Sequence, residues 1–189
     1  VAFPSSSAVS MPVAETIPFS QLAQKLEEYR KDKVVPVLLD QSESNSVDTF
    51  LQYQHTTIIE GKKCVVDKMR GKPVDEIREE LRKKLVEAMR HGVNLVLRLS
   101  NSAPMFKETF CDESTFPIEV FDGYKVTEEE VYKKLLHDDD HHDGRGSNVF
   151  FVRDTFSFVI TSTFSAEDAE EFLANSFPLD NVKLVQVQM

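Results

Sequence analysis

The chain has 189 residues, of which 41% are hydrophobic, and its formal net charge at pH 7 is −10. A chain of this length builds an ordinary core without a disulfide framework, and the acidic balance argues against nucleic acid or an anionic membrane as partner, because both need a basic surface. No apolar run approaches the roughly 20 residues of a membrane span. Cys64 and Cys111 are expected to be reduced thiols, so we expect a cytoplasmic protein.

The first residues carry serine and proline without a periodic pattern. We expect residues 1–18 to be an N-terminal extension or linker and residues 19–189 to form a single α/β domain. The sequence starts at Val1 instead of Met and has no signal-peptide pattern, so we expect a piece of a longer protein.

Amphipathic helical spacing alternates with short β-branched or apolar runs along the rest of the chain. The pattern predicts helices over 20–30, 48–53, 72–90, 105–110, 127–136 and 166–174, and strands or extended segments over 34–39, 56–59, 64–66, 93–99, 116–121, 149–152, 156–161 and 182–187. This alternation predicts a three-layer α/β fold with a mostly parallel sheet flanked by helices. The closely spaced segments 149–152 and 156–161 are expected to pair as an antiparallel edge.

The loop over residues 40–47 has the layout of a phosphate-binding P-loop, because it joins a buried strand to a helix. On the pattern G-x-x-x-x-G-K-[ST], Asp40 and Asn45 take the glycine positions, Ser46 the lysine position and Val47 the hydroxyl position. No cation is left for the phosphates and no hydroxyl for Mg²⁺. We therefore expect an inactive nucleotide site, in which Ser46 caps the following helix.

A Mg²⁺-nucleotide site also needs a carboxylate at the end of a second strand. The strand over 93–99 is followed by Ser100, Asn101 and Ser102, with no acid. The site therefore lacks two independent parts of the mechanism.

These segments together resemble a known family. VVPVLLD, DTFLQY, TTIIEGKK, MRHGVNLVLRLSNSAP and FSFVITSTFSAEDAEEFL, within residues 33–187, resemble a P-loop NTPase core. They are most similar to the ATPase-like domain of IQ-motif and ankyrin-repeat proteins and, more remotely, to a dynein-type AAA module. The resemblance places residues 40–47 at the Walker A loop, Ser100 near the Walker B acid, and Ser162 or Thr163 near a polar sensor. It implies a pseudo-NTPase, a kind of domain that serves as a scaffold or contact surface.

Residues 137–147 form an acidic and histidine-rich run that ends in glycines, the pattern of a flexible solvated loop. Imidazole and carboxylate groups also bind divalent metals, so His137, Asp139, His141 and His142 are candidate ligands. Their spacing matches neither an EF-hand loop nor the H-E-x-x-H helix.

The leading hypothesis is a non-catalytic interaction or scaffold module of a larger cytoplasmic protein, in a cytoskeletal or ciliary setting. It needs no cofactor, and its expected partner is a protein, with neither nucleic acid nor membrane. One alternative is a divergent nucleotide-binding or phosphoryl-transfer protein that borrows a cation from Lys62, Lys63 or Arg98. A second alternative is a divalent-metal-binding domain. A nucleophilic Cys64, activated by the preceding lysines, is less favoured than a core cysteine.

Overall fold

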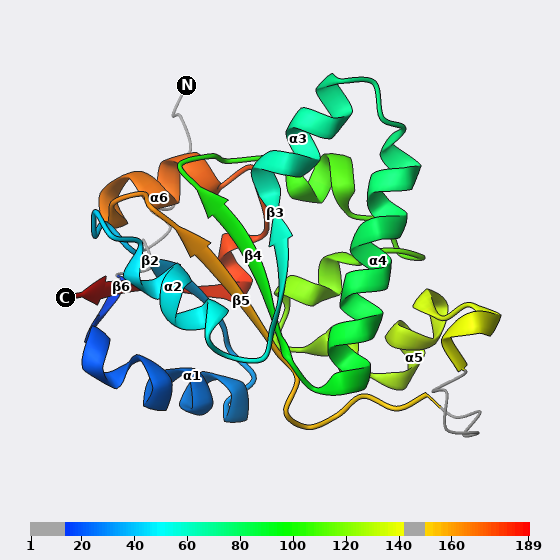
Figure 1. The fold of residues 1–189 in the computed structure, drawn as a ribbon, viewed down its shortest axis with the longest axis horizontal. Helices are drawn as coiled ribbons and strands as arrows, with labels where there is room; N and C mark the ends of the chain where they lie inside the picture. The colour runs from blue at the N-terminus through cyan, green and yellow to red at the C-terminus, as the bar shows by residue number, and fades with distance from the viewer. Residues whose placement is uncertain (1–13, 142–149) are drawn as a thin grey trace, which may run out of the picture.

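The computed structural model describes residues 14–141 and 150–189. Its centre is a six-stranded sheet with the order β1-β6-β2-β5-β4-β3, in which each pair of neighbouring strands is parallel (Figure 1). The strands are β1 (Glu15–Pro18), β2 (Val35–Leu39), β3 (Thr56–Glu60), β4 (Asn94–Ser100), β5 (Ser157–Ser162) and β6 (Val182–Gln188). The α-helices are α1 (Leu22–Lys31), α2 (Ser46–Gln52), α3 (Gly61–Met69), α4 (Val74–His91), α5 (Glu129–Tyr132) and α6 (Ala166–Leu173). No helix among these described residues is long and apolar enough to cross a membrane.

Helices cover both faces of the sheet, which confirms the predicted α/β class. α1 and α2 pack on one face in a cluster that includes Leu38 of β2 and Val96 of β4. α3, α4 and α6 pack on the other face, against Val37 and Leu39 of β2 and the remaining apolar positions of β4. Successive residues of one strand therefore enter opposite cores, which explains why these strands read as continuous apolar runs.

The longest helix follows the sequence signals closely. α4 begins directly after Pro73 and ends at Gly92, whose φ of +64° gives the left-handed C-terminal cap. Ser165 caps α6 as expected, because its side chain accepts a hydrogen bond from the backbone N–H of Asp168 at 3.1 Å.

The irregular stretch between β4 and β5 contributes aromatic rings to the core on the face of the sheet that α3, α4 and α6 cover. It contains short helical turns over Phe106–Phe110, Ile118–Phe121 and Lys125–Thr127. Six phenylalanines are fully buried there or beside it: Phe106, Phe110, Phe116, Phe121, Phe158 and Phe177. Their burial is core packing, so they form no exposed stacking surface.

The expected antiparallel edge is wrong for the described residues. β5 lies inside the sheet and bonds to β2 on one side and β4 on the other, so neither side is free to accept residues 150–152. Residues 64–66, expected as a strand, lie in α3, which begins at Gly61 directly after β3. Residues 15–18, expected in the extension, form β1 and pair with β6.

Candidate functional site

The carboxyl ends of three central strands meet at the amino end of α2. The backbone N–H of Asp40, just after β2, donates to the carbonyl of Ser162 at the end of β5, at 2.9 Å. The backbone N–H of Thr163 donates in turn to the carbonyl of Ser100 at the end of β4, also at 2.9 Å. Ligands bind at such an edge in open parallel sheets, which makes it the place to look for a nucleotide site.

Asp40 turns its carboxylate into the loop. One oxygen accepts the backbone N–H of Ser42 and the other accepts that of Val47, each at 2.8 Å, and the residue is only 4% exposed. In a P-loop, backbone N–H groups of the loop and of the helix terminus bind phosphate. Here an internal anion accepts one N–H group of the loop, from Ser42, and one of the first turn of α2, from Val47. It also lies at the positive end of the α2 dipole.

The rest of the loop is closed by its own serines. The backbone N–H of Ser46 donates to Oγ of Ser42 at 3.1 Å, and the hydroxyls of Ser44 and Ser46 lie 2.7 Å apart. Ser46 is the first residue of α2 and Asn45 precedes it, so the expectation that Ser46 caps the helix is wrong. Asn45 has a φ of +48°, a left-handed conformation that Asn tolerates well.

Val47, which the resemblance aligns with a metal-binding hydroxyl, is fully buried in the core beneath α2. Ser100, which the resemblance aligns with an acid, ends β4 and carries no carboxylate. Ser162, which the resemblance sets near a polar sensor, is also buried and donates its hydroxyl to the carbonyl of Ser100 at 3.2 Å. Val47 and Ser162 thus have structural partners within the fold.

Arg98, one of the cations that a divergent site could borrow, is already paired. Its guanidinium lies 3.1 Å from Asp48 of α2 and 2.7 Å from Glu60 of β3, and it is 16% exposed. Asp48 also accepts the hydroxyl of Thr161 at 2.8 Å. This network was not predicted from the sequence. Pairing β3 with β4 in parallel sets Glu60 beside Arg98, so that one ion pair could have been predicted from the strand register.

The histidine-rich segment is only partly described. Asp138–His141 forms a 3-10 turn in which Asp140, not one of the candidate ligands, pairs with Arg82 of α4. His137 and Asp139 are exposed, while the side chain of His141 and all of His142 lie outside the described residues. Within the described residues, no group of three His, Cys, Asp or Glu side chains could hold a metal.

The carboxylate of Asp140 is strongly engaged. Burial opposes its ionisation, but hydrogen bonds from the backbone of His137 and from Arg82 outweigh that effect and hold the pKa of Asp140 below its usual value. The Arg82 side chain is 3% exposed and also binds Glu79 at 2.7 Å. This end of the run is therefore tied to α4.

Neither cysteine is prepared for nucleophilic chemistry. Burial raises the pKa of Cys64 to about 11, and the positive charge of Lys63 lowers it too little to compensate. Burial likewise raises the pKa of Cys111 to about 12. Both thiols stay protonated at neutral pH, as expected for core cysteines.

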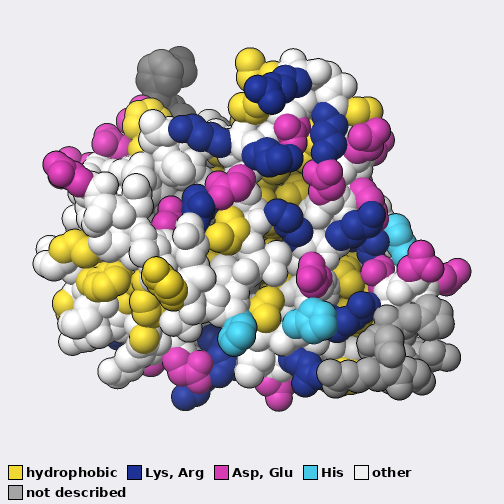
Figure 2. Space-filling view, viewed as in Figure 1, with side chains coloured by type: hydrophobic (Ala, Val, Ile, Leu, Met, Phe, Trp, Pro, Cys, Tyr) yellow, Lys and Arg dark blue, Asp and Glu magenta, His cyan; other side chains and the backbone are white. Residues whose placement is uncertain are grey.

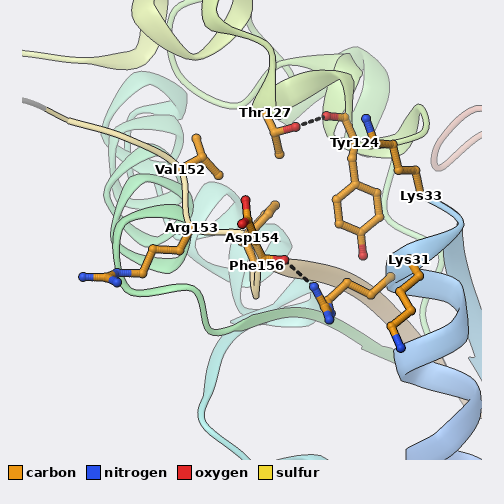
Figure 3. Close-up of a pocket in the computed structure, with 9 residues that line it drawn as sticks. Lys31, Lys33, Tyr124, Thr127, Val152, Arg153, Asp154 and Phe156 are labelled. Carbon is orange, nitrogen blue, oxygen red and sulfur yellow. Dashed lines mark hydrogen bonds between the residues drawn. The ribbon is translucent and has the colours of Figure 1, made fainter.

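A cavity of about 340 Å³ lies at the opposite, amino-terminal end of the sheet, and several cations line it (Figure 3). Figure 3 shows the side chains of Lys31 and Lys33 pointing in different directions, with Arg153 directed away from both. Arg30 is paired with Glu27 at 2.6 Å and also donates to the carbonyl of Asp154. These cations do not converge on one point, so the cavity lacks the geometry of an anion site.

No protein-family model matches the sequence, and no curated protein matches it. The function must therefore be argued from the geometry of the site.

Proposed function

We propose that this chain is a non-catalytic, pseudo-NTPase-like interaction module of a larger cytoplasmic protein. The observation that carries the proposal is the Asp40 carboxylate, which occupies the backbone donors that a P-loop offers to phosphate. If β2 is counted as the first strand and β6 as the fifth, these strands lie in the sheet in the order 5-1-4-3-2. The loop over residues 40–47 follows the first of them. This order supports the resemblance to a P-loop core.

Electrostatics decides against a triphosphate in this loop. A phosphate about 4 Å from a carboxylate is disfavoured by about 4 kcal/mol at an effective dielectric constant of about 20. That penalty corresponds to roughly three orders of magnitude in affinity. Arg98 offers no compensation, because two carboxylates already neutralise it.

Rearranging the loop to accept a nucleotide would also cost free energy. A nucleotide would have to displace a buried carboxylate from two hydrogen bonds, and the displaced group would remain at the same strand end. With no cation at Ser46 and no metal-binding hydroxyl at Val47, nothing on the loop repays that loss. What remains is a rigid α/β scaffold whose outer surfaces are available for contacts.

A thermal-shift experiment with ATP or GTP and Mg²⁺ tests the proposal. A ligand at 100 times its Kd stabilises the folded state by about 2.7 kcal/mol, a shift of several degrees. We expect no shift at 5 mM nucleotide. A clear shift that Arg98→Gln abolishes would instead favour the divergent nucleotide-binding protein.

A variant with a rebuilt motif is the matched positive control. Asp40→Gly, Asn45→Gly, Ser46→Lys and Val47→Thr together restore the P-loop pattern on the same scaffold. If this variant folds, we expect it to gain a nucleotide-dependent shift that the natural chain lacks.

A further inference from the structure

α3 and the turn after it form a basic segment on an acidic protein. Between residues 61 and 72 there are five cations, Lys62, Lys63, Lys68, Arg70 and Lys72, and one acid, Asp67, which leaves +4. Because the whole chain has a net charge of −10, the residues outside this segment carry a net charge of −14. Figure 2 shows Lys and Arg side chains gathered beside hydrophobic ones at the upper right of the view, where α3 lies in Figure 1.

Two of these cations are free to bind an outside group. Lys63 pairs with Asp67, and Lys72 pairs with Glu80 at 2.6 Å. Among the residues that the structure describes, no carboxylate lies within 4.0 Å of Lys68 or Arg70. The pKa of Asp67 is lowered chiefly by its hydrogen bond from Lys63, and the charge of Arg70 contributes at longer range. Exposed cations that make no ion pair raise the local positive potential and attract anionic groups.

An apolar groove of about 420 Å³ adjoins these cations. It is lined by Val65, Lys68 and Met69 of α3 and by Ala103, Pro104, Met105, Thr109 and Phe110 of the segment after β4. Met69 is 81% exposed and Met105 is 47% exposed, whereas Phe110 at the base is buried. Methionine side chains adapt to varied apolar partners, and they are frequent at binding surfaces.

The helix that carries this surface is held firmly. α3 begins at Gly61, directly after the last residue of β3, and Gly61 packs closely on β4. A Cβ at Gly61 would lie 3.0 Å from Cδ2 of Leu99 and 3.2 Å from the carbonyl of Arg98. The amino end of α3 is therefore fixed on the sheet, and a helix held in place lowers the entropic cost of binding.

We propose that this groove binds a short acidic segment of a partner protein that carries one or two large apolar side chains. The apolar side chain enters between Met69 and Met105, and flanking carboxylates bind Lys68 and Arg70. This inference rests on the proposed role as an interaction module and names the chemistry of its partner.

The size and charge of the molecule favour a short segment over other occupants. The groove holds one or two side chains, whereas a stable dimer buries about 800 Å² on each partner. A second copy would bring its own net charge of −10. The −14 carried elsewhere also repels an anionic membrane or a nucleic acid, and an apolar hollow does not suit a phosphate backbone.

Selection from a random displayed 12-residue peptide library on the 189-residue protein tests the proposal. We expect the enriched peptides to combine Asp or Glu with Phe, Leu, Met or Trp. We expect a synthetic peptide of the enriched sequence, measured by calorimetry, to bind at least ten-fold more weakly to the Lys68→Glu, Arg70→Glu double variant. The control is the Lys133→Glu, Lys134→Glu double variant, which changes the net charge by the same amount away from the groove. It should alter the Kd of the peptide less than two-fold.

Five outcomes would overturn the proposal. Three concern peptides: a library without enrichment, enriched peptides that lack the acidic and apolar combination, and equal binding by the Lys68→Glu, Arg70→Glu variant. The other two are a concentration-dependent dimer in sedimentation that this variant abolishes, and binding to phosphatidylserine vesicles in place of peptides. Any of these results rejects the acidic peptide as the partner of the groove. The pseudo-NTPase proposal is judged separately, and it stands if nucleotide still causes no thermal shift.

Discussion

The carboxylate of Asp40 accepts the backbone N–H of Val47 at 2.8 Å, and so the end of β2 is joined to the start of α2 from within the loop. The same carboxylate accepts the N–H of Ser42, and it is almost completely buried. A negatively charged side chain thus accepts backbone N–H groups in the loop and at the amino end of α2, a place that favours an anion. Removing it should affect both stability and anion binding.

Asp40→Ala should lower the free energy of unfolding by about 2–4 kcal/mol. The substitution removes two charge-assisted hydrogen bonds and leaves buried backbone donors without a partner. Urea denaturation at pH 7 measures the change. Glu43→Ala, an exposed acid in the same loop, is the control and should change stability by less than about 0.5 kcal/mol. A loss below 0.5 kcal/mol for Asp40→Ala would contradict the internal-anion role.

An added anion should partly rescue the Asp40→Ala variant. Sulfate at 0.1 M can occupy the vacated donors at the amino end of α2, whereas in the natural chain they are already bonded. We expect the melting temperature of the variant to rise by more than that of the natural chain in sulfate at matched ionic strength. Equal shifts would show that sulfate acts only through general salt effects.

Lys33→Gly should stabilise the protein by about 0.5–1 kcal/mol. Lys33 follows α1 with a φ of +55°, a conformation that is unfavourable for residues with a Cβ and accessible to glycine. Lys31→Gly is the control with the opposite sign, because Lys31 is helical and glycine there costs up to about 1 kcal/mol. Chemical denaturation of both variants gives the comparison, and a destabilised Lys33→Gly would refute the strain argument.

Local signals in the sequence identified much of this fold. α4 was predictable because Pro73 and Gly92 mark its two ends, and α6 because Ser165 marks its start. The loop between β2 and α2 was predictable because a polar run follows the apolar one. Each of these features depends on residues that are neighbours in the chain.

Features that depend on distant partners could not be predicted in this way. The apolar run at 64–66 reads as a strand, but it is helical because Cys64 packs into the core beneath α3. The pairing of Arg98 with Asp48 joins β4 to α2, and that of Arg82 with Asp140 joins residues 58 positions apart. The inward direction of the Asp40 carboxylate likewise follows from the closed loop conformation, which residue types alone do not specify.

Gly92→Ala should destabilise the protein by about 2–4 kcal/mol. The φ of +64° disfavours alanine, and a Cβ would lie 2.1 Å from Oγ1 of Thr155 and 2.8 Å from Cβ of Arg153. Gly71→Ala separates the two causes, because Gly71 has a φ of +91° and open space around it. We expect Gly71→Ala to cost about 1–2 kcal/mol, and equal losses for both variants would show that the contact with Thr155 carries no weight.

Asp140→Asn should destabilise the protein more at neutral pH than in acid. Arg82 is buried, so loss of the Asp140 charge leaves it with Glu79 as its remaining acidic partner, and we expect a cost of about 1–3 kcal/mol at pH 7. Because the folded-state pKa of Asp140 is lowered, its contribution is present above the unfolded value near 3.8 and is lost as the pH falls through the folded value.

Urea denaturation of both proteins at pH 7, 5 and 3 measures this dependence. The pKa of Glu79 is also lowered, chiefly by its hydrogen bond to Arg82, so the natural chain loses stability in acid from both groups. The difference between the natural chain and Asp140→Asn isolates Asp140, and it should be smaller at pH 3 than at pH 7. Asp138→Asn, an exposed neighbour, should stay within about 0.5 kcal/mol of the natural chain. A difference for Asp140→Asn that is the same at all three pH values would mean that the amide disturbs packing and that the ion pair contributes nothing.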